Sequence, residues 1–119
     1  MTFAPKKTSH RVERMEDLIR KEVAQYLLEG VKDPRIGFVT ITRVEMTKDL
    51  ENAKIYFSVY GSEKEKNETI EALEEDTKRV RHHLGTVLKI RHTPRVQFVV
   101  DEGLEASLRV NELLSQTKK

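Results

Sequence analysis

Residues 77–100 read TKRVRHHLGTVLKIRHTPRVQFVV and carry the pattern that decides the fold of this chain. At 3.6 residues per turn, one face of the first part of the segment is apolar, formed by Val80, Leu84, Val87 and Leu88. The opposite face holds Lys78, His82, Gly85 and Lys89. The pattern predicts a helix that buries its apolar face and holds its cationic face outward, ended by Thr93-Pro94 and followed by a strand.

Charge is sorted along the chain rather than mixed. Residues 77–100 contain no acidic side chain, whereas residues 62–76 carry Glu63, Glu65, Glu68, Glu71, Glu74, Glu75 and Asp76 against only Lys64 and Lys66. The formal net charge of +2 hides this segregation. A cationic segment on a regular scaffold is suited to binding a polyanion, although the same pattern also fits an ordinary solvated helix face. Gly85 fits two interpretations as well, the approach of a ligand backbone or tight packing within the protein.

Composition excludes several classes of protein. With 119 residues, 37% hydrophobic and 35% charged, the chain is expected to form one soluble globular domain. The absence of cysteine excludes disulfides and zinc–thiolate sites. No apolar run reaches the length of a membrane span, and the first residues lack an apolar signal region, so we expect a cytoplasmic protein that does not engage a membrane.

The first half of the chain shows one helix and two strands. Residues 11–28 keep helical spacing, with Ser9 as the expected N-cap and Gly30 as the stop. Residues 37–46 and 53–60 are rich in β-branched residues and alternate in the manner of strands, which predicts an antiparallel hairpin with one covered face.

The second half begins with a capping signal. Ser62 and Glu65 form a capping-box pattern that starts the acidic helix, and Asp76 or Thr77 is expected to cap the cationic helix after a kink. A third strand at 95–101 and a short helix at 104–114 complete the chain.

The resulting order is α-β-β-α-α-β-α. It predicts an α+β fold, a three-stranded sheet with helices packed on one face. We expect residues 9–114 to form a single domain, residues 1–8 a flexible basic arm and residues 115–119 a flexible tail.

Several short words of the sequence, in their order and spacing, resemble the ribosome-binding factor A family over residues 11–114. They are Arg11-Val12, Asp33-Pro34-Arg35, Val39-Thr40-Ile41-Thr42-x-Val44, Asp49-Leu50 with Ala53-Lys54-Ile55-Tyr56, Arg81-x-x-Leu84-Gly85, Thr93-Pro94-x-x-x-Phe98, Asp101 and Glu112-Leu113-Leu114. The resemblance implies a fold similar to type II KH domains, with a kinked helix pair whose cationic helix faces RNA. It also implies a factor of ribosome biogenesis, not an enzyme, that binds the 30S small subunit and its rRNA late in maturation. Support of rRNA processing and folding, notably in the cold, belongs to the same implication.

The chain departs from this family at the kink. The family usually has an Ala-x-Gly word there, and this sequence has Asp76-Thr77-Lys78. Lys78 is expected to offer charge where relatives offer backbone.

The candidate RNA-binding residues lie on the cationic helix and just beyond it. They are Lys78, Arg79, Arg81, His82, Gly85, Lys89, Arg91 and His92. The cations are expected to meet phosphates, and His82 and His92 to stack on bases or bond to 2′-hydroxyls. Arg81 lies nearer the apolar boundary than Lys89, which suggests a partly structural role. We expect a monomer that takes no cofactor and no small-molecule substrate.

Two other classes of function are open at this point. The acidic helix suits a protein–protein module that binds a basic ribosomal protein, and an enzyme acting on rRNA is the third hypothesis. No serine–histidine–carboxylate spacing and no phosphate-cradling glycine loop supports the enzyme. A metal at His82-His83 is disfavoured because adjacent helical residues point about 100° apart.

Overall fold

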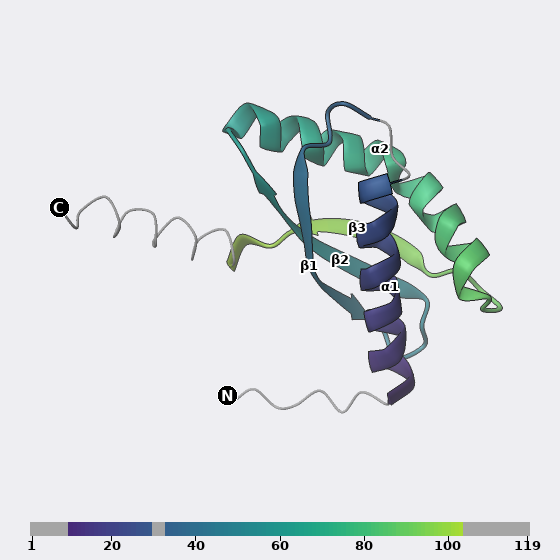
Figure 1. The fold of residues 1–119 in the computed structure, drawn as a ribbon. Helices are drawn as coiled ribbons and strands as arrows, with labels where there is room; N and C mark the ends of the chain where they lie inside the picture. The colour runs from purple at the N-terminus through teal and green to yellow at the C-terminus, as the bar shows by residue number, and fades with distance from the viewer. Residues whose placement is uncertain (1–9, 30–32, 104–119) are drawn as a thin grey trace.

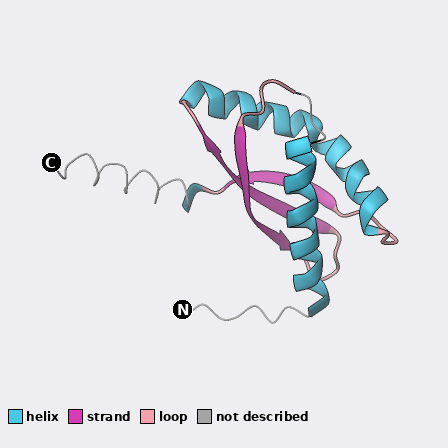
Figure 2. Cartoon of the chain, viewed as in Figure 1, coloured by secondary structure: helices cyan, strands magenta, loops and turns pink. Residues whose placement is uncertain are grey.

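Two helices and three strands make up the described part of the chain, which is residues 10–29 and 33–103 of a computed structural model. Their order is α1 (His10–Glu29), β1 (Phe38–Met46), β2 (Asn52–Tyr60), α2 (Glu63–Leu88) and β3 (Arg95–Val100) (Figures 1 and 2). The predicted α+β class is confirmed. The expected helix at 104–114, the arm, the tail and the caps Ser9 and Gly30 lie outside the described residues. Neither α1 nor α2 is long and apolar enough to cross a membrane.

The sheet has the order β1-β2-β3. β1 and β2 form the predicted antiparallel hairpin, with a register shift between Ile41 and Arg43, and β3 runs parallel to β2. A parallel neighbour needs a long crossover, and α2 supplies it (Figure 1). The start of β3 is therefore delivered beside the start of β2, where Arg95 lies opposite Asn52.

The core lies between the sheet and the two helices. The apolar face predicted for β2 is confirmed, because Ala53, Ile55, Phe57 and Val59 are all buried, but Ser58 on the opposite face is buried as well. Val12, Ile19 and Val23 of α1 and Leu73, Val80 and Leu84 of α2 belong to the same apolar cluster. Lys54 and Tyr60, on the other face of β2, are exposed. One correction concerns Val87, expected on the buried face of the cationic helix but exposed near its end.

The acidic and cationic segments form one continuous helix, α2, rather than the two helices expected. Its start is as predicted, with Ser62 and Glu65 in a reciprocal capping box. The expected cap at Asp76 or Thr77 is wrong, because the Asp76 side chain is buried and the Thr77 hydroxyl donates to the Leu73 carbonyl, 3.0 Å away. A threonine that bonds back four residues often bends a helix. Figure 1 shows the axis of α2 changing direction partway along, so the bend is present without an interruption.

α2 ends at Leu88, earlier than the Thr93-Pro94 stop that the sequence predicted. Lys89 adopts the left-handed conformation, with φ 52° and ψ 44°, and this conformation ends the helix. Lys89 is therefore not part of the helical cationic face. The chain turns there and leads through residues 90–94 into β3.

Candidate nucleic-acid interface

The second half of α2 and the loop that follows it form a shallow cationic hollow of about 470 Å³. Its lining residues are Lys78, Arg81, His82, Arg91, His92 and Thr93. Five of the eight predicted RNA-binding residues therefore meet at one place. The left-handed turn at Lys89 makes this possible, because it directs the loop back along the helix. We call this surface the basic hollow.

Gly85 and Arg81 hold the loop against α2. A Cβ atom added at Gly85 would lie 2.7 Å from the Thr93 Oγ1 atom, a separation that side chains do not tolerate. Arg81 donates a hydrogen bond from Nη2 to the Thr93 carbonyl oxygen, 3.2 Å away. The geometry thus supports the packing interpretation of Gly85, since Thr93 occupies the space that a ligand backbone would need. It also supports the partly structural role expected for Arg81.

The cations of the basic hollow are not neutralised by the acidic half of α2. Among the described residues, Lys78, Arg81 and Arg91 form no ion pair. Arg79 points outward with its side chain 82% exposed, and its Nε atom lies 4.0 Å from Asp76 Oδ1. Exposed cations without carboxylate partners are what a phosphate-binding surface requires.

The acidic residues of α2 are instead engaged by Arg35, on the turn before β1. Its Nη1 and Nη2 atoms lie 3.1 Å from Glu71 Oε1 and 2.7 Å from Glu75 Oε1. The Nη2 atom of Arg35 also donates a hydrogen bond to Asp33 Oδ2 at 2.7 Å. The hydrogen bonds from Arg35 to Asp33 lower the pKa of Asp33 to about 2. Asp33-Pro34-Arg35 entered the sequence-based predictions only as one word of the family resemblance, so this contact was not predicted.

The side chain of Asp76 lies in the interior of the protein. Only 8% of the residue is exposed, and its Oδ2 atom accepts no hydrogen bond. Burial raises the pKa of this carboxyl above its ordinary value, which the nearby Arg79 opposes. Because the carboxyl is turned inward, it does not stand beside the basic hollow as a surface charge.

A second hollow, of about 410 Å³, lies on the side of α2 that faces α1. Lys78, Arg79 and His82 line it together with Tyr26 and His83. The Tyr26 and His83 rings are 4.8 Å apart, and His83 Nε2 lies 3.5 Å from Glu22 Oε1. Tyr26 falls within the helical pattern predicted for residues 11–28 and was not among the predicted RNA-binding residues. Its polar hydroxyl on an apolar stripe was the one signal that it borders the surface.

The remaining predicted residue, Lys89, is exposed at the C-cap and lines neither of these two hollows. His82 borders both hollows, whereas His83 is directed toward α1. The side chains of these two adjacent histidines thus lie in different surroundings, as their angular separation on a helix predicts.

Comparison with known proteins connects this chain to one family. The profile of the family described as ribosome-binding factor A matches residues 11–114. The chain is 45% identical over 109 residues to the ribosome-binding factor A of Halothermothrix orenii, covering 92% of this chain and 89% of that protein. It is 41% identical over 115 residues to that of Caldanaerobacter subterraneus subsp. tengcongensis, covering 96% and 94%.

Solved structures agree. The solution structure of a Thermotoga maritima ribosome-binding factor A candidate matches with a TM-score of 0.68 and 30% identity, covering 79% of this chain and 90% of that one. A Thermus thermophilus ribosome-binding factor A fitted into a cryo-EM map of a 30S–RbfA complex matches with a TM-score of 0.62 at 22% identity, covering 72% and 90%, which supports the fold alone. From the family match and the identity to its relatives, we conclude that this chain belongs to the ribosome-binding factor A family.

Proposed function

We propose that this protein is a ribosome assembly factor that binds the 30S small subunit through its rRNA. The basic hollow is the observation that carries the proposal, because it gathers Lys78, Arg81 and Arg91 with no carboxylate partner among the described residues. A Thermus relative is described in a 30S complex, which gives the partner. The protein acts as a monomer in the cytoplasm, late in the maturation of the subunit. It supports rRNA processing and folding, including in the cold.

The chemistry of the hollow is binding rather than catalysis. Guanidinium and ammonium groups contact phosphates irrespective of base, and His82 and His92 add stacking or hydrogen bonds to 2′-hydroxyls. Among the residues that the structure describes, those that line the hollow include no carboxylate that could act on a phosphodiester. We therefore expect purified protein incubated with rRNA precursor and Mg²⁺ to leave the RNA uncut, and turnover that depends on a carboxylate would contradict this part of the proposal.

Salt dependence tests the RNA contact directly. Engagement of about four phosphates gives a slope of about −3 when the logarithm of the association constant is plotted against that of salt concentration. The measurement is binding of labelled protein to purified 30S subunits and to naked 16S-type rRNA fragments over a salt series. Binding to the naked RNA that is absent, or that does not change with salt, would refute the proposal.

Charge reversal locates the contact. Lys78→Glu with Lys89→Glu is expected to abolish 30S binding while the circular dichroism spectrum stays unchanged, because both side chains are exposed. Tested singly, Lys78→Glu should weaken binding more, since only Lys78 lines the basic hollow. The matched control is Lys48→Glu with Lys64→Glu, the same charge change at exposed positions elsewhere. Equal losses in the two double variants would remove the hollow as the binding site.

A further inference from the structure

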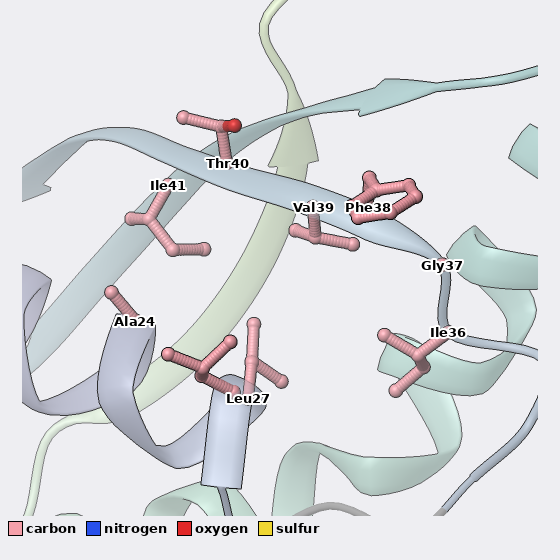
Figure 3. A pocket seen from close by; sticks show the side chains of 9 residues that line it. Ala24, Leu27, Ile36, Gly37, Phe38, Val39, Thr40 and Ile41 are labelled. Carbon is pink, nitrogen blue, oxygen red and sulfur yellow. The ribbon is translucent and has the colours of Figure 1, made fainter.

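An apolar groove lies between the end of α1 and the first half of β1, away from the basic hollow (Figure 3). Its volume is about 330 Å³. Leu27 and Leu28 line it from α1, and Ile36 and Phe38 line it from the start of β1. Figure 3 shows Val39 and Ile41 directed from β1 toward α1, so they form the floor between the two elements.

Large apolar side chains stand exposed at this groove. Leu28 is 83% exposed and Phe38 is 81% exposed. Tyr60, the cross-strand neighbour of Phe38, is 84% exposed. Two such side chains, Leu28 and Phe38, line this one apolar groove, and exposed apolar side chains at a groove mark an interaction site rather than a solvated face.

The strand beside the groove has a free edge. Among residues 10–29 and 33–103, β1 pairs with β2 alone, and β2 pairs with β3 on its other side. A free edge presents backbone donors and acceptors that a further strand can satisfy. An added strand would alternate its side chains, and every second one would enter the groove between α1 and β1.

The surroundings of the groove are acidic. The Gly37 amide donates to the Thr69 hydroxyl at 3.5 Å, which places the first half of α2 beside the start of β1. Two lysines stand against six glutamates in residues 62–75, a formal charge of −4 without the buried Asp76, and Glu65 and Glu68 near this end are exposed. Arg35 and Asp33 offset each other and leave this balance unchanged. The groove is therefore electrostatically complementary to a cationic partner and repels a polyanion such as RNA.

We propose that this groove binds an extended, lysine- or arginine-rich polypeptide segment, which adds as a strand to the free edge of β1. Apolar side chains at alternate positions of that segment enter the groove beside Leu28, on the face of β1 where Val39 and Ile41 lie. The basic side chains at the intervening positions lie on the opposite, exposed face of the sheet, and the net negative charge of the first half of α2 attracts the segment as a whole. This protein-binding surface is separate from the basic hollow, so the two partners can be held at once.

A designed peptide tests the site without a known partner. The probe is a blocked decapeptide of alternating lysine and valine, titrated into the full-length ¹⁵N-labelled protein. We expect shifts of the amide resonances of residues 27–28 and 36–41, and none in the basic hollow. Alternating glutamate–valine and lysine–serine peptides are expected to bind at least tenfold more weakly, because each lacks either the charge or the apolar side chains. Equal binding by either control peptide, or shifts confined to the basic hollow, would overturn the proposal.

Variants and modified peptides separate the parts of the interaction. The double variant Phe38→Ser with Leu28→Ser should bind the lysine–valine peptide at least tenfold more weakly than the wild type. The control variant Leu18→Ser should bind it as tightly as the wild type, because Leu18 is an exposed leucine on α1 that does not line the groove. Peptides N-methylated at every valine or at every lysine should differ at least tenfold in affinity, since only one set of amides faces the edge. Equal affinity of the two methylated peptides would overturn edge pairing. Concentration-dependent dimerisation that Phe38→Ser abolishes would instead assign the groove to a second copy of this chain.

Discussion

The contact between Gly85 and Thr93 predicts a measurable energetic coupling between α2 and the loop of the basic hollow. The perturbation is Gly85→Ala. The new Cβ atom would lie 2.7 Å from Thr93 Oγ1, while the other Thr93 atoms nearby are 3.8 and 3.9 Å away, which is ordinary contact. The hydroxyl alone is therefore the obstacle, and Thr93→Ala should remove it.

The magnitude follows from two opposing effects. Alanine favours a helix over glycine by about 1 kcal/mol. Forcing an atom into a packed contact costs about 1–3 kcal/mol. The single variant Gly85→Ala is thus expected to lose between about 0 and 2 kcal/mol of stability. In a Thr93→Ala background the same change should gain about 1 kcal/mol, so the coupling between the two positions is about 1–3 kcal/mol.

The assay is urea unfolding followed by circular dichroism at the helix band, for the wild type, both single variants and the double variant. A parallel cycle of Gly85→Ala with Thr86→Ala serves as control, because the Thr86 hydroxyl bonds to the His82 carbonyl and not toward the loop. Additivity within about 0.5 kcal/mol in the Gly85–Thr93 cycle would refute the contact. The affinity for RNA should change in parallel with stability. It should fall in Gly85→Ala, because the loop is displaced, and recover in the double variant Gly85→Ala with Thr93→Ala.

Three further predictions concern stability. Asp76→Ala should stabilise the protein by about 1 kcal/mol at neutral pH, because it removes a buried carboxylate oxygen without a hydrogen-bond partner. Burial raises the pKa of Asp76, so this gain in stability should shrink as the pH falls and the wild-type carboxyl becomes protonated. A loss of stability at neutral pH would contradict this prediction. Arg35→Met should lower the urea midpoint at neutral pH. The part of that difference owed to Asp33 should vanish as pH falls from 3.8 toward about 2, since a lowered pKa contributes stability only above this window. Leu84→Asp should leave the chain unfolded by circular dichroism, because it places a charge at a fully buried position.

Much of the fold could be predicted from local sequence signals. The Ser62–Glu65 capping box and the apolar face of β2 are short-range patterns, and both are confirmed by the structure. The junction in α2 was predicted less well. Asp76 and Thr77 resemble capping residues in sequence, but the burial of one and the back-bond of the other depend on tertiary packing that a sequence pattern does not encode.

The candidate site, like the fold, could be predicted from the sequence only in part. Periodicity placed Lys78 and His82 on an exposed face, and the structure confirms that exposure. The convergence of Arg91 and His92 on that face required the left-handed turn at Lys89, which lacks the glycine that usually signals one. The role of Arg35 could not be predicted either, because it depends on contacts with α2 at 36 and 40 residues' separation.

The sorting of charge along α2 has a structural consequence that composition conceals. Were glutamates and lysines interleaved four residues apart, each cation would have a carboxylate neighbour on the same helix face. Sorting instead places the carboxylates in the first half, where the helix dipole favours them and Arg35 engages Glu71 and Glu75 from another segment. Among the described residues, Arg79 is then the one cation of the second half that lies near a carboxylate of its own helix, and Lys78 and Arg81 have none, next to a loop that brings Arg91 beside them. One helix thus presents an unpaired cationic surface at one end and an acidic surface beside an apolar groove at the other. Under the two proposals made above, this polarity orients the protein between RNA and a basic polypeptide.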